Sequence, residues 1–162
     1  TMQRQPGEYG NALLVRGVLE DVETLALPRW QRAEPRGAVL ATAVLADVGR
    51  LSVAACHLGL GGGPMGSEAK TQLVDVLGHL GRRPPPRVVL GDFNLSARRA
   101  RPLVEATRMV LAAAPPTFPA RFPVRRIDHV GLAGLTPRRV AVARAPVSDH
   151  RPLVVEAVTS RR

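Results

Sequence analysis

The chain has 162 residues, a formal net charge of +10 and 45% hydrophobic residues. This length fits one globular domain, and the hydrophobic content is enough for a buried core, which excludes a disordered chain. A single cysteine excludes a disulfide framework and a cysteine-ligated zinc site, and the longest largely apolar run, 37–46, is too short to span a bilayer.

The positive charge comes almost wholly from arginine, because Lys70 is the only lysine among 23 basic residues. The chain is also rich in alanine, valine, leucine, glycine and proline. A basic surface favours a polyanionic or phosphorylated partner. Because the compositional bias extends to uncharged residues, the charge alone is weak evidence for nucleic acid.

The first half of the chain predicts strands followed by a helix. Apolar runs mark the candidate strands 11–15, 18–26, 39–46 and 51–57. Turn residues 47–50 separate the last two runs, which predicts an antiparallel hairpin. A glycine-rich loop, 59–66, comes next, and Ser67 then begins a helix that Gly81 and three prolines end. Apolar residues recur at helical spacing in it: Leu73, Val76, Leu77 and Leu80.

The second half predicts a strand, a helix and further strands. Val88-Val89-Leu90 is short and wholly apolar, as in a strand buried on both faces. Ser96 predicts the cap of a second helix, which Pro115-Pro116 would end. Its expected apolar side consists of Leu103, Val104, Val110 and Leu111. The remaining candidate strands are 124–131, 139–143 and 152–158, so the chain is of mixed α/β class.

Polar residues follow the Val88 strand directly. Strand alternation places Asp92 and Asn94 on one side, so that a carboxylate and an amide can face the same small ligand. Gly91 permits a close backbone approach or a sharp turn. The alternative is an ordinary strand-end turn in which both side chains bond to local backbone.

Three more segments combine carboxylates with histidines or strand ends. Asp128 lies inside an apolar run, and a buried carboxylate there needs a cation, a histidine or a metal as its partner. The alternative is that Asp128 forms an ion pair with Arg125 or Arg126 on an exposed strand face. His129 alternates to the other side, as a packing or surface residue. Asp149 and His150 precede the last strand and could bind a cation and a phosphate oxygen, or could form a surface turn.

The joint occurrence of these residues favours one site. His57 ends the 51–57 strand. Taken alone, it is equally well explained as a strand-end histidine whose ring is hydrogen-bonded within the protein and that has no role in a site. A sheet can bring such strand ends together into one polar cluster. Oxygen ligands without thiols suit Mg²⁺, Mn²⁺ or Ca²⁺ and fit phosphate chemistry.

At these residues the sequence resembles the endonuclease/exonuclease/phosphatase superfamily, whose members include deoxyribonucleases, abasic-site nucleases, inositol polyphosphate phosphatases and sphingomyelinases. The match covers nearly the whole chain as an ordered set of motifs: Tyr9-Gly10-Asn11-Ala12-Leu13-Leu14, Cys56-His57-Leu58-Gly59-Leu60, Gly91-Asp92-Phe93-Asn94, Thr117-Phe118-Pro119, Arg126-Ile127-Asp128-His129 and Ser148-Asp149-His150-Arg151-Pro152-Leu153. The resemblance implies a four-layer α-β-β-α sandwich of the deoxyribonuclease I type, with the active site at the top of two packed sheets. It also implies that a divalent cation, Mg²⁺ or alternatively Mn²⁺ or Ca²⁺, stabilises the phosphoryl group while water attacks phosphorus in line.

The same resemblance implies a role for each residue. Asp92 would orient or deprotonate the water, and Asn94 would hold the water or a phosphate oxygen. His150 would donate to the phosphate, with Asp128 fixing its orientation and raising its pKa. Asp149 would lie at the metal, where Asp92 could join it, and His57 would be a second phosphate donor or a general acid.

The chain departs from the family pattern at its start. The family carries an asparagine and a metal-binding glutamate well upstream of the Tyr9 segment, and only eight residues precede Tyr9 here. Glu8 is adjacent to that segment and cannot replace the upstream glutamate. We therefore expect residues 1–162 to form the C-terminal two-thirds of an endonuclease/exonuclease/phosphatase domain that is incomplete at its N-terminus.

Three functional hypotheses follow. The first is a metal-dependent hydrolase of phosphoesters, whose substrate could be nucleic acid, phosphoinositide, sphingomyelin or a small phosphoester, with DNA or RNA slightly favoured by the charge. The second is a catalytically impaired fragment that only binds phosphate or nucleic acid, because the upstream glutamate is absent. A structural arginine-rich nucleic-acid binder ranks last, since it leaves the ordered aspartates and histidines unexplained. No membrane segment or leader is visible in this sequence. Because we expect the true N-terminus to be missing, the location is left as unknown, with a cytoplasmic one as the default.

Overall fold

The computed structural model describes residues 10–30, 33–60, 67–145 and 147–160. In this part of the chain a larger sheet has the strand order β1-β2-β3-β4-β6-β5, and β7 and β8 form a separate two-stranded sheet. The strands are β1 (Val18–Ala26), β2 (Gly37–Leu45), β3 (Gly49–His57), β4 (Arg87–Asp92), β5 (Val110–Leu111), β6 (Asp128–Ala133), β7 (Leu135–Val142) and β8 (Leu153–Thr159). The helices are α1 (Ser67–Gly81) and α2 (Ala97–Glu105).

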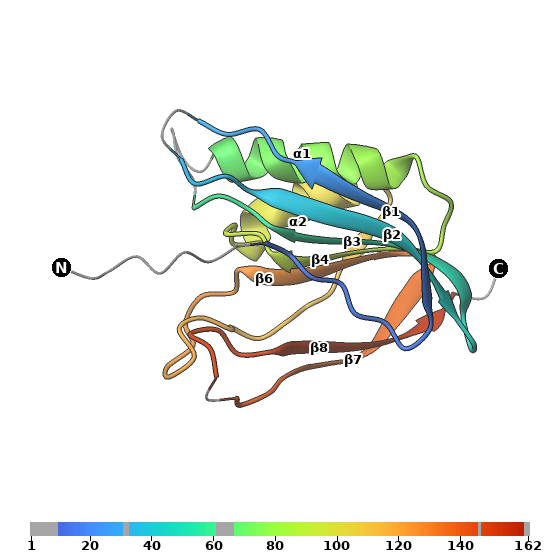
Figure 1. Cartoon of the computed structure of the whole chain (residues 1–162). Helices are drawn as coiled ribbons and strands as arrows, with labels where there is room; N and C mark the ends of the chain where they lie inside the picture. Colours follow the sequence, from blue (N-terminus) through green and yellow to red (C-terminus); the bar gives the residue numbers. More distant parts are fainter. Residues whose placement is uncertain (1–9, 31–32, 61–66, 146, 161–162) are drawn as a thin grey trace.

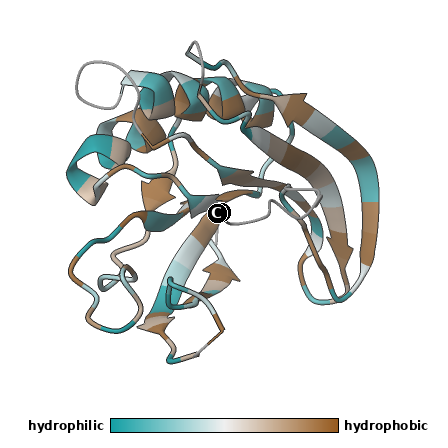
Figure 2. Ribbon diagram, turned by 60° about the vertical axis from the view of Figure 1, so that its left-hand side comes forward, coloured by the Kyte–Doolittle hydropathy of each residue, from teal (hydrophilic) through white to brown (hydrophobic). Residues whose placement is uncertain are grey.

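The two helices cover one side of the larger sheet, and β7 and β8 lie on its other side (Figure 1). Alternation along the strands divides the apolar residues between these two sides. On β2, Leu40 packs toward the helices while Ala41 packs toward the small sheet. On β4, Val89 and Val88 divide in the same way. The central strands beneath α1 are therefore hydrophobic over most of their length (Figure 2).

The predicted hairpin is present and forms two neighbouring strands of the larger sheet. β2 and β3 pair antiparallel from Gly37 opposite His57 to Leu45 opposite Gly49. β3 then pairs in parallel with β4, and α1 supplies the crossover between them. Parallel pairing places the carboxyl ends of β3 and β4 at the same edge of the sheet.

The helix beginning at Ser67 forms as predicted and ends at Gly81. Its buried side includes Leu73, Val76, Leu77 and Leu80, the residues with helical spacing. The expected loop 59–66 lies outside the described residues from position 61 onward.

The second helix is shorter than predicted. It ends at Glu105, and Val110 and Leu111 form the short strand β5 instead, pairing with β6 at the edge of the sheet. Ser96 occupies the N-cap position, but its side chain makes no capping hydrogen bond. Apolar residues at 110 and 111 fit a short strand as well as a helical face, and the helical pattern alone could not separate the two.

Two strand predictions also need correction. The apolar run 11–15 forms no regular strand, although Leu13 and Val15 pack against the core between the sheets. The run 124–131 begins its strand only at Asp128. Asp128 therefore lies at a strand end, where its carboxylate can reach other elements, and is not enclosed within a strand as predicted.

The fold is the mixed α/β class with packed sheets that the sequence predicts. The described residues show a helical layer, the larger sheet and the smaller sheet. Neither described helix combines the length and the hydropathy that crossing a membrane requires.

Candidate active site

Sheet pairing places three of the predicted site residues in one row. His57 ends β3 and pairs with Asp92, the last residue of β4. Asp92 pairs on its other side with Asp128, the first residue of β6. His150 reaches this row from the loop before β8, so both sheets contribute to the cluster.

Asp92 lies at the centre of the cluster. Its Oδ2 atom is 3.4 Å from Nε2 of His57 and 3.8 Å from Nε2 of His150. Its Oδ1 atom accepts a hydrogen bond of 2.8 Å from the backbone N–H of Asn94. The Asp92 side chain is 14% exposed, so this carboxylate is largely removed from water.

The electrostatics follow from this burial and from the neighbouring charges. Burial raises the pKa of Asp92, and the charge of Asp128 raises it further, while the Asn94 N–H and the two histidines oppose the change. Burial also lowers the pKa of His57, and the Arg36 guanidinium adds to that effect, against Asp92 and Glu34. His57 is thus favoured in its neutral form, in which a ring nitrogen can accept a hydrogen bond or a proton.

His150 and Asp128 form a hydrogen-bonded pair. Nδ1 of His150 lies 2.8 Å from Oδ2 of Asp128, which fixes the proton on Nδ1 and aims Nε2 toward Asp92. The Phe118 ring packs against the His150 ring at a centroid distance of 4.8 Å. The same Oδ2 atom of Asp128 accepts a hydrogen bond from the hydroxyl of Thr117. The alternative ion pairs of Asp128 with Arg125 or Arg126 do not form in the described part of the chain.

Asn94 links the cluster to the loop after β3. Its backbone has a positive φ of 49°, a conformation that asparagine tolerates better than most residues. Its Nδ2 donates to the carbonyl oxygen of Leu58 at 2.8 Å. The structure therefore combines the predicted turn geometry at Asp92 and Asn94 with a position beside both histidines.

Three further residues that the sequence analysis named are Asp149, His129 and Tyr9. Asp149 is exposed, next to His150, and its Oδ1 accepts a hydrogen bond of 3.4 Å from the Ser148 hydroxyl. His129 is buried on the opposite side of β6 from Asp128, where its Nε2 donates to the carbonyl oxygen of Leu95 at 2.8 Å. Tyr9, in the first of the motifs, lies outside the described residues.

Two residues that contact the site were given no role by the sequence patterns. Thr117 is fully buried and holds Asp128, although the sequence showed it only as part of a short motif. Arg36 is also buried, with Nη1 3.1 Å from Nδ1 of His57 and Nη2 2.9 Å from Glu34. Arg36 stands just before β2, in a chain with 23 basic residues, so no sequence signal separates it from the other arginines.

The donor set is suited to a hard divalent cation. One ligand atom each from Asp92, Asp128 and His150 lies within 4.8 Å of the others. The two carboxylates match the oxygen preference of Mg²⁺ and Mn²⁺, whereas the imidazole is a nitrogen donor that these hard cations prefer less. The mutual repulsion of the two carboxylates, which contributes to the raised pKa of Asp92, is a second reason why a cation would be stabilised there.

Comparison with protein families finds one match, the endonuclease/exonuclease/phosphatase family, over residues 3–150. None of the curated proteins compared with this sequence matches it significantly.

Solved structures of similar shape come from bacteria and from human. An endonuclease/exonuclease/phosphatase from Beutenbergia cavernae has a TM-score of 0.75 and 22% identity, over 89% of this chain and 46% of that one. The human Nocturnin catalytic domain, with bound sulfate anion, has a TM-score of 0.70 and 19% identity, over 88% and 60%. The 3′ phosphatase NExo from Neisseria, bound to a product DNA hairpin, has a TM-score of 0.59 and 18% identity, over 87% and 72%. The likeness is one of fold, and the chain spans about half of the Beutenbergia protein's length.

Proposed function

This chain belongs to the endonuclease/exonuclease/phosphatase family, and from that membership we propose that it is a divalent-metal-dependent hydrolase of phosphoester bonds, acting as a phosphodiesterase, nuclease or phosphatase. The observation that carries the proposal is the cluster of Asp92, Asp128 and His150, whose ligand atoms gather where both sheets meet. An ordinary strand-end turn requires no such meeting of two sheets.

The proposed reaction is an in-line attack of water on phosphorus. Asp92 would hold the attacking water and accept its proton, since burial has raised the pKa of this carboxyl group toward that of an effective base. Asn94 would position the same water through its side-chain oxygen, because its Nδ2 already donates to Leu58. The developing negative charge on the phosphoryl oxygens is what the site must stabilise.

The histidines would supply the donors to the phosphate. His150 donates through Nε2 when protonated, and the 2.8 Å hydrogen bond from its Nδ1 to Asp128 keeps the ring in that orientation. His57, on the other side of Asp92, would be the second donor through the N–H of its neutral ring, and the alternative role of acid for the leaving oxygen would require its protonated form, which its lowered pKa disfavours.

A divalent cation, Mg²⁺ or alternatively Mn²⁺ or Ca²⁺, would supply Lewis-acid stabilisation of the phosphoryl group. Asp92 would hold it, with the negative charge of Asp128 close by and Asp149 contributing from the adjacent exposed position, while His150 would keep its role as a donor to the phosphate.

The proposal is tested with the full chain on two small chromogenic substrates, bis(p-nitrophenyl) phosphate and p-nitrophenyl phosphate, with Mg²⁺, with Mn²⁺ and with EDTA. We expect metal-dependent hydrolysis that Asp92→Asn or His150→Ala lowers by about a hundredfold or more. Asp75→Asn is the matched control, because this residue lies on α1, away from the cluster.

Two results would contradict the proposal. Asp92→Asn with an unchanged metal-dependent rate would remove the carboxylate from the mechanism. A folded wild-type chain without turnover on either substrate would favour the alternative of a phosphate- or nucleic-acid-binding module.

A further inference from the structure

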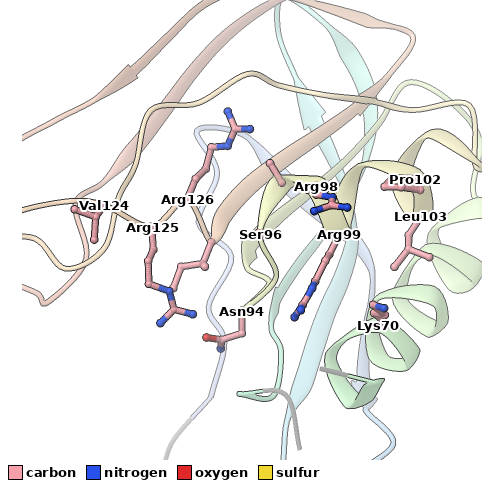
Figure 3. A pocket seen from close by; sticks show the side chains of 12 residues that line it. Lys70, Asn94, Ser96, Arg98, Arg99, Pro102, Leu103, Val124, Arg125 and Arg126 are labelled. Atoms are coloured by element: carbon pink, nitrogen blue, oxygen red, sulfur yellow. The ribbon is translucent and has the colours of Figure 1, made fainter. Parts of the chain in front are cut away.

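A groove of about 1020 Å³ opens beside the candidate site at Asn94 (Figure 3). Five of its lining residues are cations and none is acidic: Lys70 from α1, Arg98 and Arg99 from the first turn of α2, and Arg125 and Arg126 from the segment before β6. Figure 3 shows Arg125 and Arg126 on one wall, Arg98, Arg99 and Lys70 on the other, and Asn94 between them. Five positive charges therefore lie at one concave surface next to the cluster, with no carboxylate in its lining.

Among the residues that the structure describes, most of these cations have no acidic partner. In the described part of the chain no carboxylate oxygen lies within 4.0 Å of the charged nitrogens of Lys70, Arg98, Arg99 or Arg125. Arg126 is held by the carbonyl oxygen of Ala114, to which Nη1 donates at 2.8 Å, and this fixes one wall of the groove. Clustered cations repel one another, and a bound anion would relieve this repulsion, so anion binding in the groove is electrostatically favourable.

The shape of the groove decides what kind of anion fits. Cations on two facing walls match an anion that enters between them, whereas a flat lipid bilayer would meet only the rim. A lone phosphomonoester at Asp92 would leave the far wall without a partner. Pro102, Leu103 and Val124 also line the groove and offer apolar contact, as sugars and bases require.

We propose that this groove binds the sugar–phosphate backbone of a nucleic acid strand whose scissile phosphate lies at the Asp92 cluster. The proposal rests on the proposed function and narrows it to substrates that carry further phosphates beyond the reacting one. Arg98 and Arg99 contact those flanking phosphates from one wall, and Arg125 contacts them from the other.

The test measures binding in the absence of turnover. Fluorescence anisotropy of a labelled single-stranded DNA of about 12 nucleotides is recorded in EDTA, over a salt series that shows the number of phosphate contacts. For Arg98→Ala/Arg99→Ala we expect a roughly tenfold weaker Kd and a log Kd against log salt slope that is lower by about 1.4, or about 0.7 for each lost contact. Arg125→Ala, from the other wall, should weaken binding by itself.

The matched control is Arg138→Ala/Arg139→Ala. These adjacent residues are exposed on β7 in the smaller sheet, and their removal changes the net charge by the same amount. Equal weakening by this control and by the groove variants would overturn the proposal, because binding would then follow total charge. Unchanged oligonucleotide binding in both groove variants would also overturn it.

The same variants also test whether the groove binds a membrane surface. Binding to phosphatidylserine-containing vesicles that Arg98→Ala/Arg99→Ala abolishes, with oligonucleotide binding unaffected, would replace the nucleic acid by a lipid surface. The proposed function fails separately, through the hydrolysis rates of wild type and Asp92→Asn. Groove binding without turnover and turnover without groove binding are therefore distinguishable results.

Discussion

At Gly91 the backbone of β4 passes so close to β3 that no side chain fits. An added Cβ would lie 1.8 Å from the carbonyl oxygen of Cys56, and the φ of +139° is one that residues with a side chain rarely adopt. The obstacle is backbone of a paired strand, which cannot move without breaking the sheet. This close approach sets Asp92 directly beside His57.

Gly91→Ala is therefore expected to destabilise the protein by at least about 3 kcal/mol, through both the clash and the strained φ. Gly78→Ala is the matched control, because Gly78 lies on α1 with nothing within 4 Å of an added Cβ. It should stabilise the helix by about 0.5–1 kcal/mol. Urea denaturation of the two variants checks both signs, and similar midpoints would contradict the steric argument.

The sequence predicted which residues gather at the site better than how each is held. His57 and Asp92 were singled out at strand ends and His150 just before a strand, whereas Asp128 was singled out as a carboxylate within an apolar run. The expectation that they meet came from the way a sheet brings strand ends together. Of the two partners of Asp128, His150 was expected from the family resemblance, whereas Thr117 could not be predicted, since it reaches Asp128 through tertiary packing and not through spacing along the chain. The metal role of Asp149 stays a prediction.

At the scale of elements, an ion-pair cluster ties the edge strand β1 to the end of α1. Glu23 on β1 pairs through Oε1 with His79 at 3.1 Å and through Oε2 with Arg83 at 3.1 Å. The Arg83 hydrogen bond lowers the pKa of Glu23, and His79 adds to this. His79, to which the sequence assigned no chemistry, is thus a structural contact between α1 and the sheet.

Glu23→Gln is expected to lower the urea midpoint slightly at pH 7, because Glu23 is exposed and such pairs contribute little. A carboxyl group whose folded pKa is lowered stabilises the protein above its unfolded pKa, and this contribution is lost as the pH falls through the folded pKa. The difference between wild type and variant should therefore shrink between about pH 5 and pH 3. A difference that keeps growing below about pH 5 would contradict the pairing.

Elements with a clear hydrophobic period or a turn signal were predicted well. Short apolar segments that fit both a helix and a strand were not. The 67–81 helix and the β2–β3 hairpin follow from periodicity and turn residues alone. Val110 and Leu111 were assigned to a helix because two apolar residues carry no period, and pairing with β6 decided their conformation. The parallel pairing of β3 with β4 involves residues far apart in sequence, which local patterns do not encode.

At the scale of the whole molecule, the partly buried carboxylates of the candidate site lower the free energy of unfolding when no cation is bound. Burial raises the pKa of Asp92, so its ionised form is disfavoured in the folded protein, and the nearby Asp128 adds repulsion. A bound divalent cation would relieve both effects and stabilise the folded state by mass action.

We therefore expect Mg²⁺ or Mn²⁺ at millimolar concentration to raise the thermal midpoint of the wild-type chain, and EDTA to reverse the change. Asp92→Asn should have a higher midpoint than wild type in EDTA and should lose most of the response to metal. Differential scanning fluorimetry measures both, with Asp75→Asn as the control that keeps the response. A wild-type midpoint that is independent of metal would contradict a cation site at this cluster.

The parallel pairing of β3 with β4 also governs the order in which the molecule can assemble. The hairpin of β2 and β3 closes through a short turn, whereas β4 joins β3 only after the chain from 58 to 86, including α1, has folded back. Asp128 and His150 come later still in the chain, so each step toward the cluster carries its own loop-closure cost. Asp92, Asp128 and His150 are consequently expected to meet late in folding. A partly synthesised chain that lacks β6 or the loop before β8 cannot form the cluster, so any function of the cluster has to wait until nearly the whole described chain is in place.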